Sequence, residues 1–163
     1  MTQRQPNFLD TLAGLIPGYT GYAERDKRRS QDKRLRDHVA LELDRSKRQL
    51  DVLIEMVVQR GELEGLDEVD ALKRAVGTCA DTLRHAPAGA SGLMDDVVVK
   101  EADLERVLQH DHDLHSKAEE LTTSISSLTS ATFRAAIPDV RRLVRDFEKA
   151  IQQREAILSE VFH

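Results

Sequence analysis

The sequence predicts an all-α protein: an antiparallel four-helix up-down bundle with long, coiled-coil-like helices and a short extra N-terminal helix. Charged residues make up 33% of the 163 residues and aromatic residues only 4%, with no Trp. This balance is typical of long amphipathic helices rather than of β-sandwiches or barrels. No Gly or Pro occurs over residues 23–60, and apolar residues recur at helical spacing. A chain of this length is expected to form a single domain, 1–163.

Composition also limits the function classes. The single cysteine, Cys79, excludes an intrachain disulfide and a Cys-rich metal site, and we expect it to be a buried core residue. The sequence has neither an apolar run long enough to span a membrane nor a secretory signal pattern, so the expected location is cytoplasmic. No catalytic, small-molecule or cofactor motif is recognisable. We therefore predict a non-enzymatic protein without a cofactor.

The first 22 residues predict a short helix followed by a Pro-Gly-Tyr turn. The apolar residues of this segment share one helical face if the helix starts at Asn7 or Asp10 and ends at Pro17. We expect this helix to cover the bundle. An alternative is a peripheral membrane-surface protein that inserts Phe8–Ile16 at the interface, with the basic segment behind it contacting anionic headgroups.

Residues 23–60 predict one long helix with two unlike halves. No residue from Glu24 to Arg34 is apolar, whereas apolar residues recur at helical spacing from Leu35 to Val57. The second half can pack in the bundle. The first half has no apolar side chain with which to pack, so we expect it to project past the bundle or to be covered by a second copy.

Charge is unevenly distributed along the chain. The net charge is −5, yet residues 24–48 hold ten Lys and Arg against six Asp and Glu. This basic segment can steer an acidic partner or hold two copies together. Nucleic-acid binding is a further alternative. The interleaved acids lie three or four residues from cations, however, which favours a solvated helix face stabilised by its own ion pairs.

Residues 17–34 are therefore the predicted partner-binding surface of an interaction or scaffold protein that self-associates or binds another protein. The two tyrosines of the turn either lock it onto neighbouring helices through their hydroxyls or contact a partner. The candidate partner-binding residues are Tyr19, Tyr22, Arg25, Arg28, Arg29, Lys33 and Arg36.

Three more long helices complete the predicted bundle, at residues 66–86, 100–128 and 138–162. Small residues at 87–92 predict a linker. Ile137-Pro138 marks the start of the last helix, because the residue before Pro resists the α conformation and Pro suits the first helical turn. Val97–Val99 favours extended structure and is expected to be an apolar strap or the start of the next helix.

Two polar residues interrupt the apolar seams of the last two helices. Asp111 lies in the seam of 100–128 and Arg154 in the seam of 138–162. In an antiparallel hairpin centred near residue 133 they lie at the same level, so we predict that they form a buried polar pair that sets the register.

Histidines and aspartates cluster between His110 and His115, and such side chains suit zinc or iron. On a helix, His112 and His115 share a face, while His110 points elsewhere. We interpret the cluster as solvated histidines beside one core aspartate. The sequence predicts no metal, with His112 and His115 as the candidate ligands should one bind.

Overall fold

The computed structural model describes residues 7–86 and 94–162, and every regular element within them is a helix. The all-α prediction is confirmed, with 79% of the described residues helical. The elements are α1 (Phe8–Leu15), a short 3-10 helix η1 (Arg25–Lys27), α2 (Arg28–Gln59), α3 (Leu66–His85), α4 (Glu101–Ser126) and α5 (Phe133–Val161).

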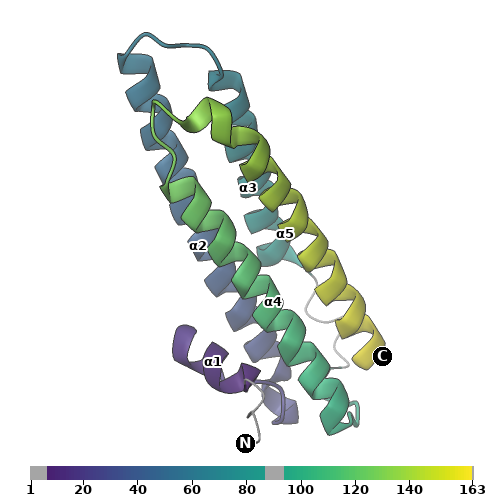
Figure 1. The fold of residues 1–163 in the computed structure, drawn as a ribbon. Coiled ribbons are helices and arrows are strands. Elements are labelled where there is room, and N and C mark those ends of the chain that lie inside the picture. The colour runs from purple at the N-terminus through teal and green to yellow at the C-terminus, as the bar shows by residue number, and fades with distance from the viewer. Residues whose placement is uncertain (1–6, 87–93, 163) are drawn as a thin grey trace, which may run out of the picture.

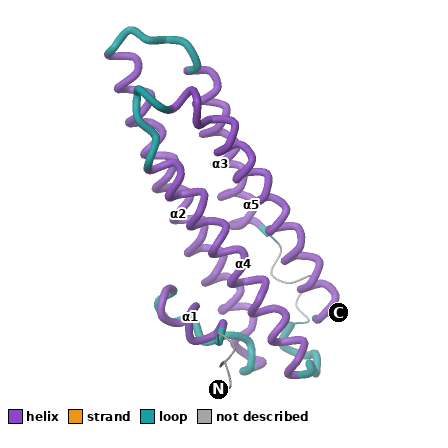
Figure 2. The backbone as a smooth tube through the Cα atoms, viewed as in Figure 1, coloured by secondary structure: helices purple, strands orange, loops and turns teal. Residues whose placement is uncertain are grey.

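The four long helices lie alongside one another, and successive ones run in opposite directions (Figure 1). Helix α2 packs against α3 and α4, and α5 packs against α4 and α3, so each long helix contacts two others. Helix α1 packs against α4 near the end of the molecule where α2 begins (Figure 2).

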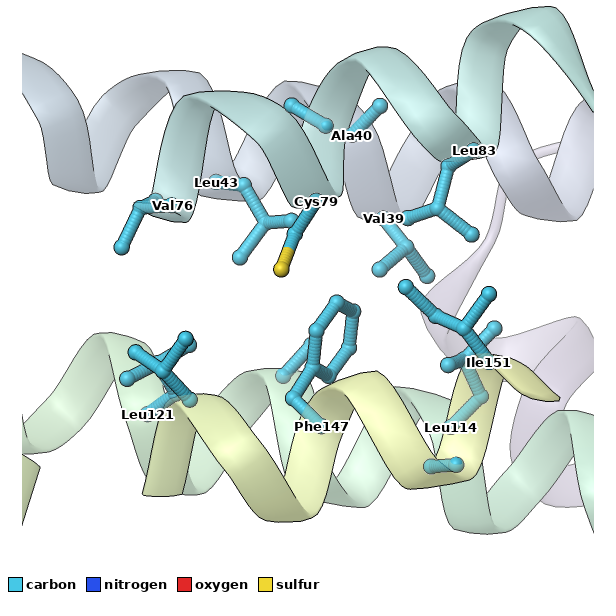
Figure 3. Packing of buried hydrophobic residues seen from close by; sticks show 14 of the residues in the cluster. Val39, Ala40, Leu43, Val76, Cys79, Leu83, Leu114, Leu121, Phe147 and Ile151 are labelled. Carbon is cyan, nitrogen blue, oxygen red and sulfur yellow. The ribbon is translucent and has the colours of Figure 1, made fainter. Parts of the chain in front are cut away.

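Apolar side chains of all four long helices fill the space between them. Figure 3 shows Phe147 of α5 extending toward α3, close to the sulfur of Cys79, with Leu43 of α2 beside them. All three side chains are buried, as the sequence predicts for Cys79. Burial raises the pKa of the Cys79 thiol to about 12, so Cys79 behaves as a small neutral core residue.

Helix α5 begins at Phe133, before the predicted boundary at Pro138. Proline is tolerated there because it removes only the bond to the Arg134 carbonyl, within the first two turns. The preceding turn is fixed by two threonines: the Thr129 N–H donates to Oγ1 of Thr132, and the Thr132 N–H donates to Oγ1 of Thr129, both at 3.2 Å. These bonds start the helix early enough to carry Pro138 inside it.

One other helix boundary differs from the expectation, and one open alternative is decided. Helix α2 begins at Arg28 rather than near residue 23, after η1. The run Val97–Val99 belongs to no helix, with Val99 packed on the core and Val98 82% exposed; of the two expected alternatives, it is therefore a strap and not the start of α4. The predicted linker at 87–92 lies outside the described residues.

Candidate functional site

The turn after α1 carries both tyrosines into the interior. Tyr19 and Tyr22 are buried, and their rings meet edge to face with centroids 6.2 Å apart. Gly18 and Gly21 have φ values of 77° and 74°, a backbone conformation that favours glycine. These two positions let the chain reverse between α1 and α2, and the reversal points both hydroxyls at α4.

Asp111 of α4 is the centre of a buried polar network. Its Oδ2 accepts hydrogen bonds from the hydroxyls of Tyr19 at 2.7 Å and Tyr22 at 2.5 Å. Its Oδ1 accepts from Nε of Arg154 of α5 at 2.6 Å. The structure thus brings together the predicted pair Asp111 and Arg154. It also adds Tyr19 and Tyr22, whose hydroxyls lock the turn onto α4, which is one of the two roles that the sequence predicts for them.

Arg154 extends this network to α2. Its Nη2 donates to Oδ1 of Asp32 at 2.7 Å and to the Tyr22 hydroxyl at 3.1 Å. The other carboxylate oxygen of Asp32 accepts from Nε of Arg36 at 3.1 Å, and Nη1 of Arg36 donates to the Leu83 carbonyl oxygen at the end of α3 at 2.7 Å. The network therefore joins the turn to all four long helices.

The electrostatics of the network favour a structural role. Burial, reinforced by neighbouring charges, raises the pKa of Tyr19 and Tyr22 well above the ordinary value, so both hydroxyls stay protonated. Burial alone acts to lower the pKa of Arg154, but the Asp111 and Asp32 carboxylates outweigh it and raise the pKa. The charges of Asp32, Asp111 and Arg154 are paired with one another and buried, which fits a structural role.

Arg28 connects the turn to two later parts of the chain, the segment before α4 and the residue that follows α5. Its Nε donates to the Tyr22 carbonyl oxygen at 2.9 Å, and its Nη1 donates to the carbonyl oxygens of Met94 at 2.9 Å and Val97 at 2.8 Å. The guanidinium lies over the Phe162 ring, 5.3 Å from its centroid. Arg28 thus holds the segment before α4 and the end of α5 against the turn.

Four of the predicted partner-binding residues are buried and do not lie on the surface. These buried residues are Tyr19, Tyr22, Arg28 and Arg36. The expectation that residues 24–34 project from the bundle is wrong, because this segment packs through hydrogen bonds instead of apolar contacts. Buried Gln31, for example, accepts from the Thr20 N–H at 2.7 Å, and Arg34 donates to the Pro17 carbonyl oxygen at 3.1 Å.

The other three candidates, Arg25, Arg29 and Lys33, are exposed. Nε of Arg29 lies 3.6 Å from Asp95, and Nζ of Lys33 lies 2.5 Å from Asp37. These ion pairs offset part of the positive charge that a nucleic-acid partner would need.

The apolar face of α1 points inward. Leu12 and Ile16 are buried, and Phe8 and Leu9 are partly buried against the core. A membrane-surface helix would need this face turned outward, so the membrane alternative lacks its contact surface in this structure. Among the described residues, none of the helices combines the length and apolarity needed to cross a membrane.

The two histidine candidates have different neighbours. The His112 ring lies 5.0 Å from the Phe8 ring of α1, whereas His115 is buried facing α2, where its ring stacks on His38 at 5.7 Å. Nε2 of His115 lies 3.7 Å from Oε1 of Glu42. Sequence reasoning missed His38 and Glu42, although their spacing of four residues places them on one helical face.

The protonation states of this second cluster follow from its surroundings. Burial lowers the pKa of His38, and the Glu42 carboxylate only partly offsets this. Burial acts to raise the pKa of Glu42, but His115, His38 and Arg45 outweigh it and leave that pKa below its ordinary value. A neutral imidazole beside an ionised carboxylate is therefore favoured.

Replacing Tyr22 with Phe is expected to lower the free energy of unfolding by about 1–3 kcal/mol. The Tyr22 hydroxyl donates to Asp111 and accepts from Arg154, so its removal leaves two buried groups short of a partner. Tyr19→Phe removes a single donor and should cost less. Urea unfolding followed by circular dichroism measures both, and an equal or larger loss for Tyr19→Phe would contradict the central position of Tyr22.

In comparisons with known proteins, the chain matches no family model, no curated protein and no solved structure.

Proposed function

We propose that this protein is an antiparallel four-helix up-down bundle with coiled-coil-like packing that serves as a non-enzymatic interaction or scaffold module and self-associates through the outer face of α2. The proposal places it in the cytoplasm, a reducing compartment in which the buried free thiol of Cys79 would stay reduced. The closed polar network supports the non-enzymatic role.

The observation that carries the proposal is an exposed seam along α2. Six exposed positions follow one another at alternating steps of four and three, the spacing of a coiled-coil seam. They are Leu41, Arg45, Arg48, Val52, Glu55 and Gln59. Because all six positions are exposed, this spacing is available for packing against a second copy.

An apolar groove lies beside this seam. Its volume is about 400 Å³, and it runs between α2 and the end of α4, with Val52, Met56 and Ile125 in its lining and Arg45 and Arg48 at its edge. Val52 is 55% exposed and Met56 47%. Two large apolar side chains next to each other on a helix surface provide area that a second helix can bury.

The seam is self-complementary when two copies pack antiparallel. A two-fold axis near Leu50 places Arg45 opposite Glu55 of the partner subunit, and Arg48 opposite Val52 of the partner subunit. The same axis places Leu41 opposite Gln59 of the partner subunit. Each contact occurs twice, as a two-fold interface requires. Oppositely charged residues at facing positions favour this register over a parallel one, which would set Arg45 against Arg45 of the partner subunit.

Charge reversal tests this interface. Sedimentation equilibrium of the full chain should show a dimer, and Arg45→Glu or Glu55→Arg alone should raise the dimer Kd at least tenfold, because each places like charges opposite one another. The double variant should restore dimerisation, since it re-creates both pairs in the opposite sense. Arg142→Glu, at an exposed position of α5, is the control and should leave the Kd unchanged.

Two results would overturn the proposal. One is a monomeric wild-type chain at about 100 μM, since this is far above the Kd of typical specific dimers. The other is a double variant that associates no better than either single variant, which would show that the two residues do not face each other.

A further inference from the structure

A cluster of three metal-ligating side chains lies between α2 and α4. His38 and Glu42 come from one face of α2, and His115 comes from α4. Oε1 of Glu42 lies 3.4 Å from Nε2 of His38 and 3.7 Å from Nε2 of His115. Candidate ligand atoms from the three side chains lie within 4.8 Å of one another. His115 is buried and the other two side chains are half-buried.

These separations fit the geometry of a metal centre. With metal–ligand bonds of about 2.1 Å, two ligands of a tetrahedral ion lie roughly 3.4 Å apart. The two distances from Glu42 to the imidazole nitrogens are close to this value. They are longer than ordinary N–H···O hydrogen bonds, which cluster at about 2.9–3.0 Å. The three atoms are therefore placed more like ligands around a common centre than like a hydrogen-bonded chain.

A second observation also points to a missing partner. The other carboxylate oxygen of Glu42, Oε2, is buried and has no hydrogen-bond partner among the described residues. Leaving a charged oxygen unsatisfied in a protein interior is costly. A cation bound by Glu42 would neutralise this carboxylate and offset that cost.

We propose that His38, Glu42 and His115 bind a divalent transition-metal ion of the zinc class. Two imidazoles and one carboxylate form a ligand set that zinc uses when a fourth position is left for water or an external ligand. A neutral imidazole and an ionised carboxylate are the forms that bind metal. Arg45 acts on both His38 and Glu42 and opposes the ion, so binding depends on the Glu42 charge.

Metal binding at this position would connect two helices. His38 and Glu42 belong to α2 and His115 to α4, so one ion would cross-link these helices beside the buried core. An ion that binds the folded chain and not the unfolded one raises the apparent stability. Zn²⁺ is therefore expected to raise the Tm of the chain, and EDTA is expected to reverse the increase.

The test uses the untagged full chain after removal of metal with EDTA. Zn²⁺ affinity is measured by competition with a chromophoric chelator, and Co²⁺ provides a visible spectrum that reports tetrahedral coordination. We expect one Zn²⁺ per chain. His38→Gln and Glu42→Gln should each weaken Zn²⁺ binding at least tenfold and remove the Co²⁺ bands. His85→Gln, which removes an exposed histidine of α3, should do neither.

Circular dichroism of each variant separates loss of a ligand from loss of the fold. His115→Gln should also abolish binding; if this buried substitution prevents folding, the two α2 variants on half-buried positions still decide the question. The proposal is overturned if wild-type protein binds Zn²⁺ no more tightly than the folded His38→Gln and Glu42→Gln variants. It is equally overturned if His85→Gln weakens binding as much as they do.

Discussion

Arg154→Met is expected to lower the free energy of unfolding by about 3–5 kcal/mol. Arg154 is buried and bonds to the carboxylates of Asp111 and Asp32. Met fills a similar volume but carries no charge, so both carboxylates lose their shared cation in a site that water does not reach. In a chain of this length such a loss lowers the Tm by on the order of 10 °C, which thermal unfolding by circular dichroism can measure.

A control and a double-mutant cycle make this result specific. Arg106→Met removes an arginine whose ion pairs with Asp103 and Glu160 are exposed, and it should change the Tm little, because exposed pairs contribute little to stability. Asp111→Asn and the double variant with Arg154→Met should show a coupling energy of about 0.5–3 kcal/mol, as for residues in contact. Additive effects would show that Asp111 and Arg154 do not act as a pair.

Phe147→Ala is the other substitution expected to have a large effect, a loss of about 3–5 kcal/mol. The Phe147 ring is fully buried where α5 meets α3, with Leu43 of α2 nearby (Figure 3). Alanine would remove most of the apolar contact and leave a cavity, because the surrounding backbone is fixed by the long helices.

Phe8→Ala is the matched control for Phe147→Ala. Phe8 is only partly buried, at the start of α1, so its removal opens a gap that solvent can enter and should cost clearly less. Guanidinium unfolding gives both values with a common reference. If Phe8→Ala were the more destabilising, α1 and not the centre of the bundle would be the main source of stability.

Strong apolar periodicity predicts the helical segments of this chain. The later half of α2 and the seam of α5 follow the expected pattern, because apolar spacing on a helix reports directly which face is buried. The same periodicity predicts the pairing of Asp111 with Arg154, because each interrupts an apolar seam and a chain reversal near residue 133 places them at one level. Predicting their hydrogen bond therefore needs only helix geometry and the position of this chain reversal.

The start of α2, which has no apolar residue, is a segment whose burial hydrophobic patterning does not predict. Hydrophobic patterning assigns such a segment to solvent, yet Arg28, Gln31 and Asp32 are buried. They are buried because carbonyl, backbone N–H and guanidinium groups from other parts of the chain complete their hydrogen bonds. Such partners have no fixed sequence spacing, so no local pattern predicts them.

The sequence by itself determined the helical class of this protein, the apolar seams and the pairing of Asp111 with Arg154, since each follows from helical periodicity. Only the tertiary structure decided that Tyr19 and Tyr22 serve the interior and that His115 meets His38 and Glu42 instead of His112. The physical reason is the same in both cases. The position of a buried polar side chain depends on its partners on other helices, and only tertiary packing brings those partners within hydrogen-bonding or metal-binding distance.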